Sequence, residues 1–160
     1  MKKAIFENKQ IYDEIDVSLI NLLSEDASMT GTELAEKIGL SIPATNKRIM
    51  KLVESGVIRK RTIIVDPEKV GKPLLAFVQV ILENINYINE LEEGLERDPD
   101  FLECYATTGE YDYLIKVRAK GIDDFENKLV GIKRIKGVVK TNTMFSLCIH
   151  KEMASVLPDF

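Results

Sequence analysis

Hydrophobic residues recur at helical spacing through the first third of the chain. A first helix is predicted after Asp13, an N-cap residue followed by apolar positions three and four apart. A second is predicted at TGTE, where Thr30 and Glu33 have the spacing of a capping box, and Gly39 ends it. The residues expected to face inward are Ile15, Leu19, Leu22, Leu23, Leu34, Ala35 and Ile38.

A third helix is predicted to follow almost at once. Ser41 is its N-cap, Pro43 fits its first turn, and Gly56 stops it. Two helices joined by so short a connection are typical of a helix-turn-helix. The next stretch, VIRKRTIIVD, is β-branched and basic, which predicts a strand serving as a wing. The inward positions expected on this helix are Ile42, Thr45, Ile49, Leu52 and Val53.

The pattern changes after DPEKVGKP, which we interpret as a stiff linker over residues 66–73. Strand and helix patterns then alternate in the order β-α-β-β-α-β, which is typical of a ferredoxin-like antiparallel sheet with both helices on one face. The fold class expected is α+β. The expected organisation is a winged helix-turn-helix domain over 1–65, the linker, a ferredoxin-like domain over 74–150 and a tail over 151–160.

The first strand of the second domain, LLAFVQVIL, is apolar on both faces. The two helices would cover one face of the sheet, and the other face would be an exposed apolar surface in a monomer. We therefore expect two sheets to pack face to face in a homodimer.

Composition excludes several classes of protein. Apolar residues make up 45% of the 160 residues and charged residues 30%, as in globular proteins. The apolar stretch near the start, Ala4 to Phe6, is too short for a signal peptide, and the longest apolar run is too short for a membrane span, so a cytoplasmic protein is expected. Cys104 and Cys148 lie far apart, and we expect both to be reduced core residues. No metal site, cofactor or catalytic residue is predicted.

Charge is distributed unevenly along the chain. The formal net charge is −4, but residues 1–65 hold 10 Lys+Arg against 9 Asp+Glu, and residues 66–160 hold 12 against 17. Within 41–61 there are 6 basic residues and a single acid, Glu54. A local basic patch in an acidic chain indicates a contact with a polyanion, although a solvated helix face would have the same charge count.

Three segments carry a resemblance to a known family: IDVSLINLLSEDASMTGTELAEKIGLSIPATNKRIMKLVESGVI, TTGEYDYLIKV and GVVKTNTMFSL. The first is similar to the DNA-binding half, and the other two are similar to segments of the C-terminal domain, of the Lrp/AsnC (leucine-responsive and asparagine-responsive, or feast/famine) family of regulators. The resemblance covers about Asp13 to His150. It implies a transcription factor that binds double-stranded DNA as a dimer or a ring of dimers, up to an octamer, and that often senses an amino acid where dimers meet.

On the third helix, the exposed face suits major-groove recognition. Asn46 could pair with adenine, Lys47 with guanine, and Ala44 with a thymine methyl group. Ser41 and Thr30 could contact phosphate or act only as helix caps. The DNA-binding residues expected are Ser41, Pro43, Ala44, Asn46, Lys47, Arg48, Lys51, Arg59, Lys60 and Arg61.

In the second domain, the turn TGEYD offers free backbone N–H groups near Gly109 that could hold a carboxylate, and Asp112 could hold an ammonium group. A plain β-turn would explain the same residues, and the family resemblance favours the ligand site. The effector-binding residues expected are Gly109, Glu110, Tyr111, Asp112, Thr141, Asn142 and Thr143.

Two alternatives remain open. A DNA-compacting protein would make the same phosphate contacts with weak sequence preference. Some proteins similar to this family are sirohaem decarboxylases, whose chemistry is thought to need histidines in the C-terminal domain. This chain contains a single histidine, His150, so an enzyme is not expected.

Overall fold

The computed structural model describes residues 11–158. The described chain divides into two compact units, one over residues 11–64 and 153–158 and the other over Val65–Glu152, and each is described by itself. Among the described residues, no helix is long and apolar enough to cross a membrane.

The first unit is helical, as the periodicity predicts. Asp13, Thr30 and Ser41 are confirmed as N-caps, and the first two form reciprocal capping boxes with Asp16 and Glu33. Between the second and third helices Gly39 has φ +70°, a left-handed conformation that glycine adopts without a steric penalty. The helices are α1 (Glu14–Glu25), α2 (Gly31–Ile38) and α3 (Ile42–Glu54).

The core of this unit lies between the three helices. Leu19, Leu23, Leu34, Ile49 and Leu52 are buried together there. Two expectations for α3 were wrong, because Ile42 and Val53 are 44% and 49% exposed. They lie at the two ends of the helix, beyond the stripe that α1 and α2 cover.

The predicted wing strand is not present. The segment predicted as the wing, residues 57–66, forms no strand in the structure. A strand needs a neighbouring strand to pair its backbone N–H and C=O groups. The described part of the first unit contains no other strand. Ile63 and Ile64 are accordingly 82% and 76% exposed.

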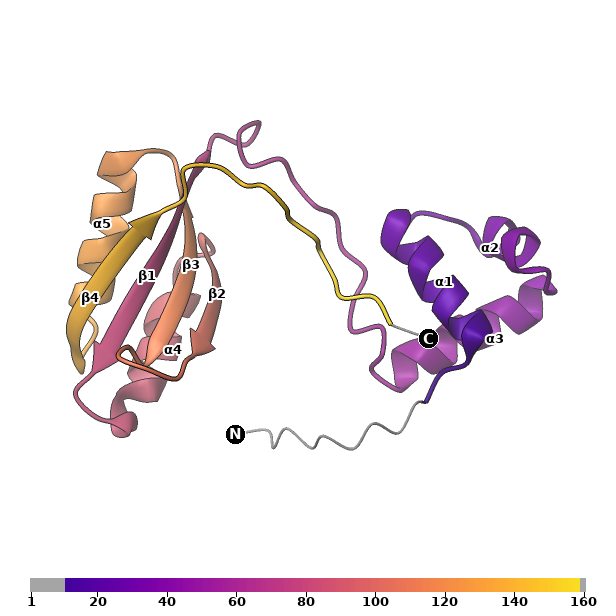
Figure 1. The fold of residues 1–160 in the computed structure, drawn as a ribbon, viewed down its shortest axis with the longest axis horizontal. Helices are drawn as coiled ribbons and strands as arrows, with labels where there is room; N and C mark the ends of the chain where they lie inside the picture. The colour runs from indigo at the N-terminus through magenta and orange to yellow at the C-terminus, as the bar shows by residue number, and fades with distance from the viewer. Residues whose placement is uncertain (1–10, 159–160) are drawn as a thin grey trace. The chain divides into compact units, whose positions relative to one another are not determined.

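The second unit has the predicted β-α-β-β-α-β order. Its strands form one antiparallel sheet in the order β2-β3-β1-β4, and Figure 1 shows α4 and α5 together on one face of that sheet. A short 3-10 turn, η1 (Ile85–Tyr87), precedes α4. The elements are β1 (Leu74–Leu82), α4 (Ile88–Glu96), β2 (Phe101–Ala106), β3 (Tyr113–Ala119), α5 (Ile122–Lys133) and β4 (Val138–Phe145).

The core of the second unit fills the space between the sheet and its helices. Val78 and Val80 of β1, Ile115 of β3, Leu91 of α4 and Ile132 of α5 are almost completely buried. On the opposite face of the sheet, Phe77, Ile81 and Leu114 are only half-buried.

The expectation that both cysteines are core residues was wrong. Cys104 and Cys148 are free and exposed. Cys104 lies on β2, an edge strand with a neighbour on one side only, and Cys148 follows the end of β4. At Cys104, burial of the thiol among neighbouring atoms and the nearby Glu92 carboxylate nevertheless raise the pKa to about 11.

Candidate DNA-binding helix and effector hairpin

One face of α3 is exposed and carries four of the ten predicted DNA-binding residues. Thr45, Ile49 and Leu52 are buried, which turns the opposite side of the helix outward. The Ser41 hydroxyl accepts a hydrogen bond from the backbone N–H of Ala44 at 3.4 Å and so fixes the start of the helix. The exposed side chains on this face are Pro43, Asn46, Lys47, Met50 and Lys51.

Arg48 differs from its neighbours because it turns toward α1. Its Nη1 lies 2.8 Å from Asp13 Oδ2 and 2.8 Å from Asp16 Oδ1. The pKa of Asp13 is lowered, first by the hydrogen bond from the Asp16 backbone N–H and then by the bond from Arg48. Bonds to Asp13 and Asp16 raise the pKa of Arg48. Arg48 was expected to contact phosphate, and in this structure its guanidinium is paired with Asp13 and Asp16 while its side chain stays 30% exposed.

Asp16 is the residue of this region that sequence reasoning missed. Its side chain is 2% exposed and it binds both the Asp13 backbone N–H and Arg48. The D-x-x-D spacing of Asp13 and Asp16 matches that of a capping box, so it was the signal available in the sequence.

The remaining predicted DNA contacts fall into two groups. Arg59, Lys60 and Arg61 are exposed on the segment that follows α3. Ala44 is half-buried, and Thr30 accepts a hydrogen bond from the Glu33 backbone N–H at 3.2 Å as the cap of α2.

The loop between β2 and β3 forms a closed hairpin. Thr107 closes it, because its backbone N–H donates to Asp112 O at 2.8 Å and its hydroxyl donates to Tyr111 O at 2.7 Å. Gly109 at the tip has φ +119°, which only glycine adopts readily. The backbone N–H groups of residues 108–111 make no hydrogen bond to any residue that the structure describes. They are free to donate to an anion.

Asp112 is partly committed to the fold. Its Oδ2 accepts a hydrogen bond from the Leu82 backbone N–H at 2.9 Å, where the pairing register of β1 with β4 shifts between Ile81 and Leu82. Its backbone N–H also donates to Val80 O at 3.0 Å. Asp112 thus fastens the hairpin to β1, and only its other oxygen is left for a ligand.

A further residue of the hairpin region, Lys140 of β4, was not predicted. Its Nζ lies 2.9 Å from Glu110 Oε1 and 5.0 Å from the centre of the Tyr111 ring. Bonds to Glu110 and Tyr111 raise the pKa of Lys140. The sheet register alone brings Lys140 to this end, because it pairs with Ile81.

The three predicted residues of β4 do not share one face of the sheet. Thr141 and Thr143 pair with the buried Val80 and Val78, whereas Asn142 points to the opposite face and donates to Gln79 Oε1 at 2.8 Å. Thr141 lies level with the base of the hairpin, since Val80 also pairs with Tyr113. Asn142 and Thr143 lie further along the strand.

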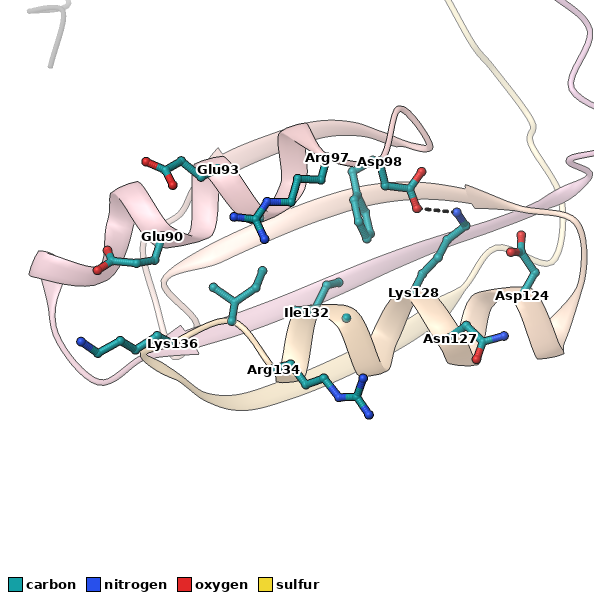
Figure 2. Close-up of a pocket in the computed structure, with 14 residues that line it drawn as sticks. Glu90, Glu93, Arg97, Asp98, Asp124, Asn127, Lys128, Ile132, Arg134 and Lys136 are labelled. Carbon is teal, nitrogen blue, oxygen red and sulfur yellow. Dashed lines mark hydrogen bonds and ion pairs between the residues drawn. The ribbon is translucent and has the colours of Figure 1, made fainter.

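A groove of about 600 Å³ runs between α4 and α5, away from the hairpin residues. Figure 2 shows Lys128 of α5 reaching toward Asp98 at one end of this groove, and their N–O distance is 2.6 Å. Lys128 also lies 2.9 Å from Asp100, which is paired in turn with Lys72. These charges are engaged with one another, so we interpret them as structural.

A helix-turn-helix with a basic exposed helix, on the same chain as a ferredoxin-like sheet, defines a class of DNA-binding regulators. Two family models match this chain: the winged helix-turn-helix DNA-binding model at residues 12–59 and the Lrp/AsnC ligand binding domain model at residues 75–156. The HTH-type transcriptional regulator FL11 of Pyrococcus horikoshii is 41% identical over 140 residues, which are 88% of this chain and 92% of the relative. The chain belongs to the Lrp/AsnC family of transcriptional regulators.

Solved structures agree with this assignment. A transcriptional regulator from Neisseria meningitidis, in complex with L-methionine, superposes with a TM-score of 0.86 at 26% identity, covering 91% of this chain and 96% of that one. A feast or famine regulatory protein from M. tuberculosis, also complexed with L-methionine, gives a TM-score of 0.83 at 29% identity, covering 91% and 99%. The α+β fold and the assignment to this family are therefore confirmed.

Proposed function

We propose that α3 is the recognition helix and reads operator DNA with its exposed face. The observation that carries this proposal is the stripe of Pro43, Asn46, Lys47 and Lys51, which core packing turns outward together. Such a helix enters the major groove with its N-terminal part, where Asn46 and Lys47 would face base edges. Lys51, Arg59, Lys60 and Arg61 would contact phosphates, which position a protein without reading sequence.

The direct test is charge reversal at Lys47. Lys47→Glu should weaken binding to a selected operator roughly ten-fold or more while the thermal midpoint stays unchanged. Lys133→Glu on the exposed surface of α5 is the matched control, and it should bind as the natural chain does. Equal affinity for all three proteins would reject α3 as the recognition helix.

Operator selectivity separates this proposal from DNA compaction. A sequence-specific regulator should prefer its operator over random DNA by about a thousand-fold or more at physiological salt. A ratio near one would favour a compacting protein. The regulator would act in the cytoplasm and without enzymatic activity of its own. An absorbance scan showing bound tetrapyrrole would contradict that part of the proposal.

We propose further that the hairpin senses a free amino acid. The unbonded N–H groups around Gly109 suit a carboxylate, and the free oxygen of Asp112 suits an ammonium group. Glu110 and Tyr111, held by Lys140, would supply side-chain selectivity, with Thr141 the nearest of the three predicted β4 residues. Bound L-methionine in two solved relatives supports this class of ligand.

A thermal-shift screen against the free amino acids tests the sensor. At a concentration of 100 times the dissociation constant, a ligand stabilises the folded state by about 2.7 kcal/mol, which shifts the midpoint by several degrees. L-methionine is the first probe, and D-methionine is its control. If no amino acid raises the midpoint, the chain regulates without this class of effector.

We propose that the uncovered sheet face forms a homodimer interface. Phe77, Ile81 and Leu114 are half-buried there without a helix above them, and Met144 is 44% exposed. Dimers could assemble further into a ring of up to eight chains. Analytical ultracentrifugation should give at least the dimer mass, and Phe77→Lys should reduce it. A natural chain that sediments as a monomer would refute the interface.

A further inference from the structure

Gly31, the first residue of α2, lies next to the side chain of Asn46 on α3. A Cβ atom placed on Gly31 would come within 2.6 Å of Asn46 Oδ1 and within 3.4 Å of its Nδ2. Atoms at 2.6 Å without a hydrogen bond repel each other strongly, so an added methyl group and the amide cannot occupy that space together. The amide of Asn46 therefore fills the position that a side chain would take at residue 31.

The backbone of Gly31 is held firmly where this contact occurs. On either side of it, the Thr30 backbone N–H donates to Glu33 Oε2 at 2.7 Å, and the Glu33 backbone N–H donates to Thr30 Oγ1 at 3.2 Å. This capping box encloses Gly31 in the first turn of α2. A larger residue there would displace the Asn46 side chain rather than the helix backbone.

The Asn46 side chain, in contrast, is free of the core. It is exposed, whereas Thr45 and Ile49 of the same helix are buried, so core packing does not choose its rotamer. We infer that Gly31 is a positioning residue for DNA recognition: the absence of a side chain at residue 31 sets the direction in which the Asn46 amide faces a base pair. The inference rests on the proposed role of α3.

Gly31→Ala should separate stability from specificity. Alanine forms helices better than glycine, and only the end of an exposed side chain must move, so the thermal midpoint should stay the same or rise. A well-aligned asparagine contact discriminates between bases by about five-fold to a hundred-fold. Displacing the amide should change base preference at the single position that Asn46 reads by an amount within that range.

The experiment is selection of bound DNA from a random pool with the full chain and four variants. Asn46→Ala should remove the preference at one base pair. Gly31→Ala should change the preference at that same base pair, and Gly31→Ala combined with Asn46→Ala should match Asn46→Ala alone. Gly131→Ala is the control, because a Cβ atom on this glycine of α5 meets nothing within 4 Å. Its selected sequences should equal those of the natural chain.

The outcomes distinguish the inference from the proposal beneath it. If Asn46→Ala changes the selected sequences and Gly31→Ala does not, the positioning role is refuted and the recognition helix stands. The positioning role is also refuted if Gly31→Ala changes the base preference by the same amount whether residue 46 is asparagine or alanine. If the natural chain enriches no sequence, both the proposed function and this inference fail.

Discussion

Arg48 of α3 and Asp16 of α1 are joined by an ion pair whose N–O distance is 2.8 Å. Asp16 is 2% exposed at its side chain and Arg48 is 30% exposed, so one partner is buried and the other lies at the surface. The same arginine also binds Asp13, the N-cap of α1. The N-cap of α1 and the contact of α3 with α1 therefore share a single cluster of three charges.

Asp16→Asn should destabilise the first unit by about 1–3 kcal/mol, because it leaves the Arg48 charge with only the exposed Asp13 as a partner. The measurement is the urea midpoint followed by circular dichroism. Glu14→Gln, an exposed acid in the same turn, is the matched control and should change stability by less than about 0.5 kcal/mol. Equal effects of the two variants would show that the ion pair contributes nothing.

Gly109→Ala should destabilise the second unit by about 1–3 kcal/mol, since an alanine at φ +119° is strained. It should also weaken any amino-acid response, because the N–H groups of the hairpin would move. Thermal unfolding with and without ligand measures both effects. Gly131→Ala, at an unstrained helical position, should be neutral or stabilising. If Gly109→Ala melts at the temperature of the natural chain, the strain argument is wrong.

Acid should weaken the second unit through Asp100. Burial raises the pKa of this carboxyl. Hydrogen bonds and charges from Lys72 and Lys128 together lower it by more than burial raises it, so the pKa falls below its ordinary value of 3.8. A carboxyl with a lowered pKa contributes stability that is complete above its unfolded pKa and is lost as pH falls through the folded value. The free energy of unfolding should therefore decrease below about pH 4.

Asp100→Asn isolates this contribution. It should lower stability at pH 7 and reduce the loss between about pH 4 and pH 2 in urea titrations. Asp123→Asn, an exposed acid in the first turn of α5, is the control. An acid dependence that remains unchanged in Asp100→Asn would assign the effect to other carboxyls.

The two cysteines should differ in reactivity. The thiolate is the nucleophile, and with a pKa of about 11 only on the order of one Cys104 thiol in ten thousand is ionised at pH 7. Cys148 is exposed, with its Sγ 3.2 Å from His150 Nε2, so a thiol reagent should modify it first. Cys148→Ser should remove the fast phase of labelling and Cys104→Ser the slow phase. A single rate for both thiols would contradict this order.

Local sequence signals predicted most of the fold. The caps Asp13, Thr30 and Ser41 and the helix-turn-helix connection depend on neighbouring residues, so the sequence contains all that is needed to recognise them. The prediction of a wing strand was wrong because β propensity is a property of one segment, whereas a strand also requires a second strand to pair with. Residues 59–65 have the propensity but no partner strand within the described part of their unit.

The sites were predicted less completely than the fold. Spacing identified the exposed face of α3. It could not distinguish Arg48 from the other basic residues of α3, because the ion pair of Arg48 is with Asp16, 32 residues earlier in the chain. Lys140 reaches the hairpin only through the register of β4 on β1, which periodicity does not reveal. The contact of Gly31 with Asn46 likewise arises from how α2 and α3 pack.

The strand order has a consequence for synthesis on the ribosome. β1 pairs with both β3 and β4, so its second edge stays open until residue 145 has been made. The three helices of the first unit are complete by Glu54, and domains generally fold as units, N-terminal first, during synthesis. A nascent chain can therefore complete all three helices of the first unit before the sheet of the second unit can close.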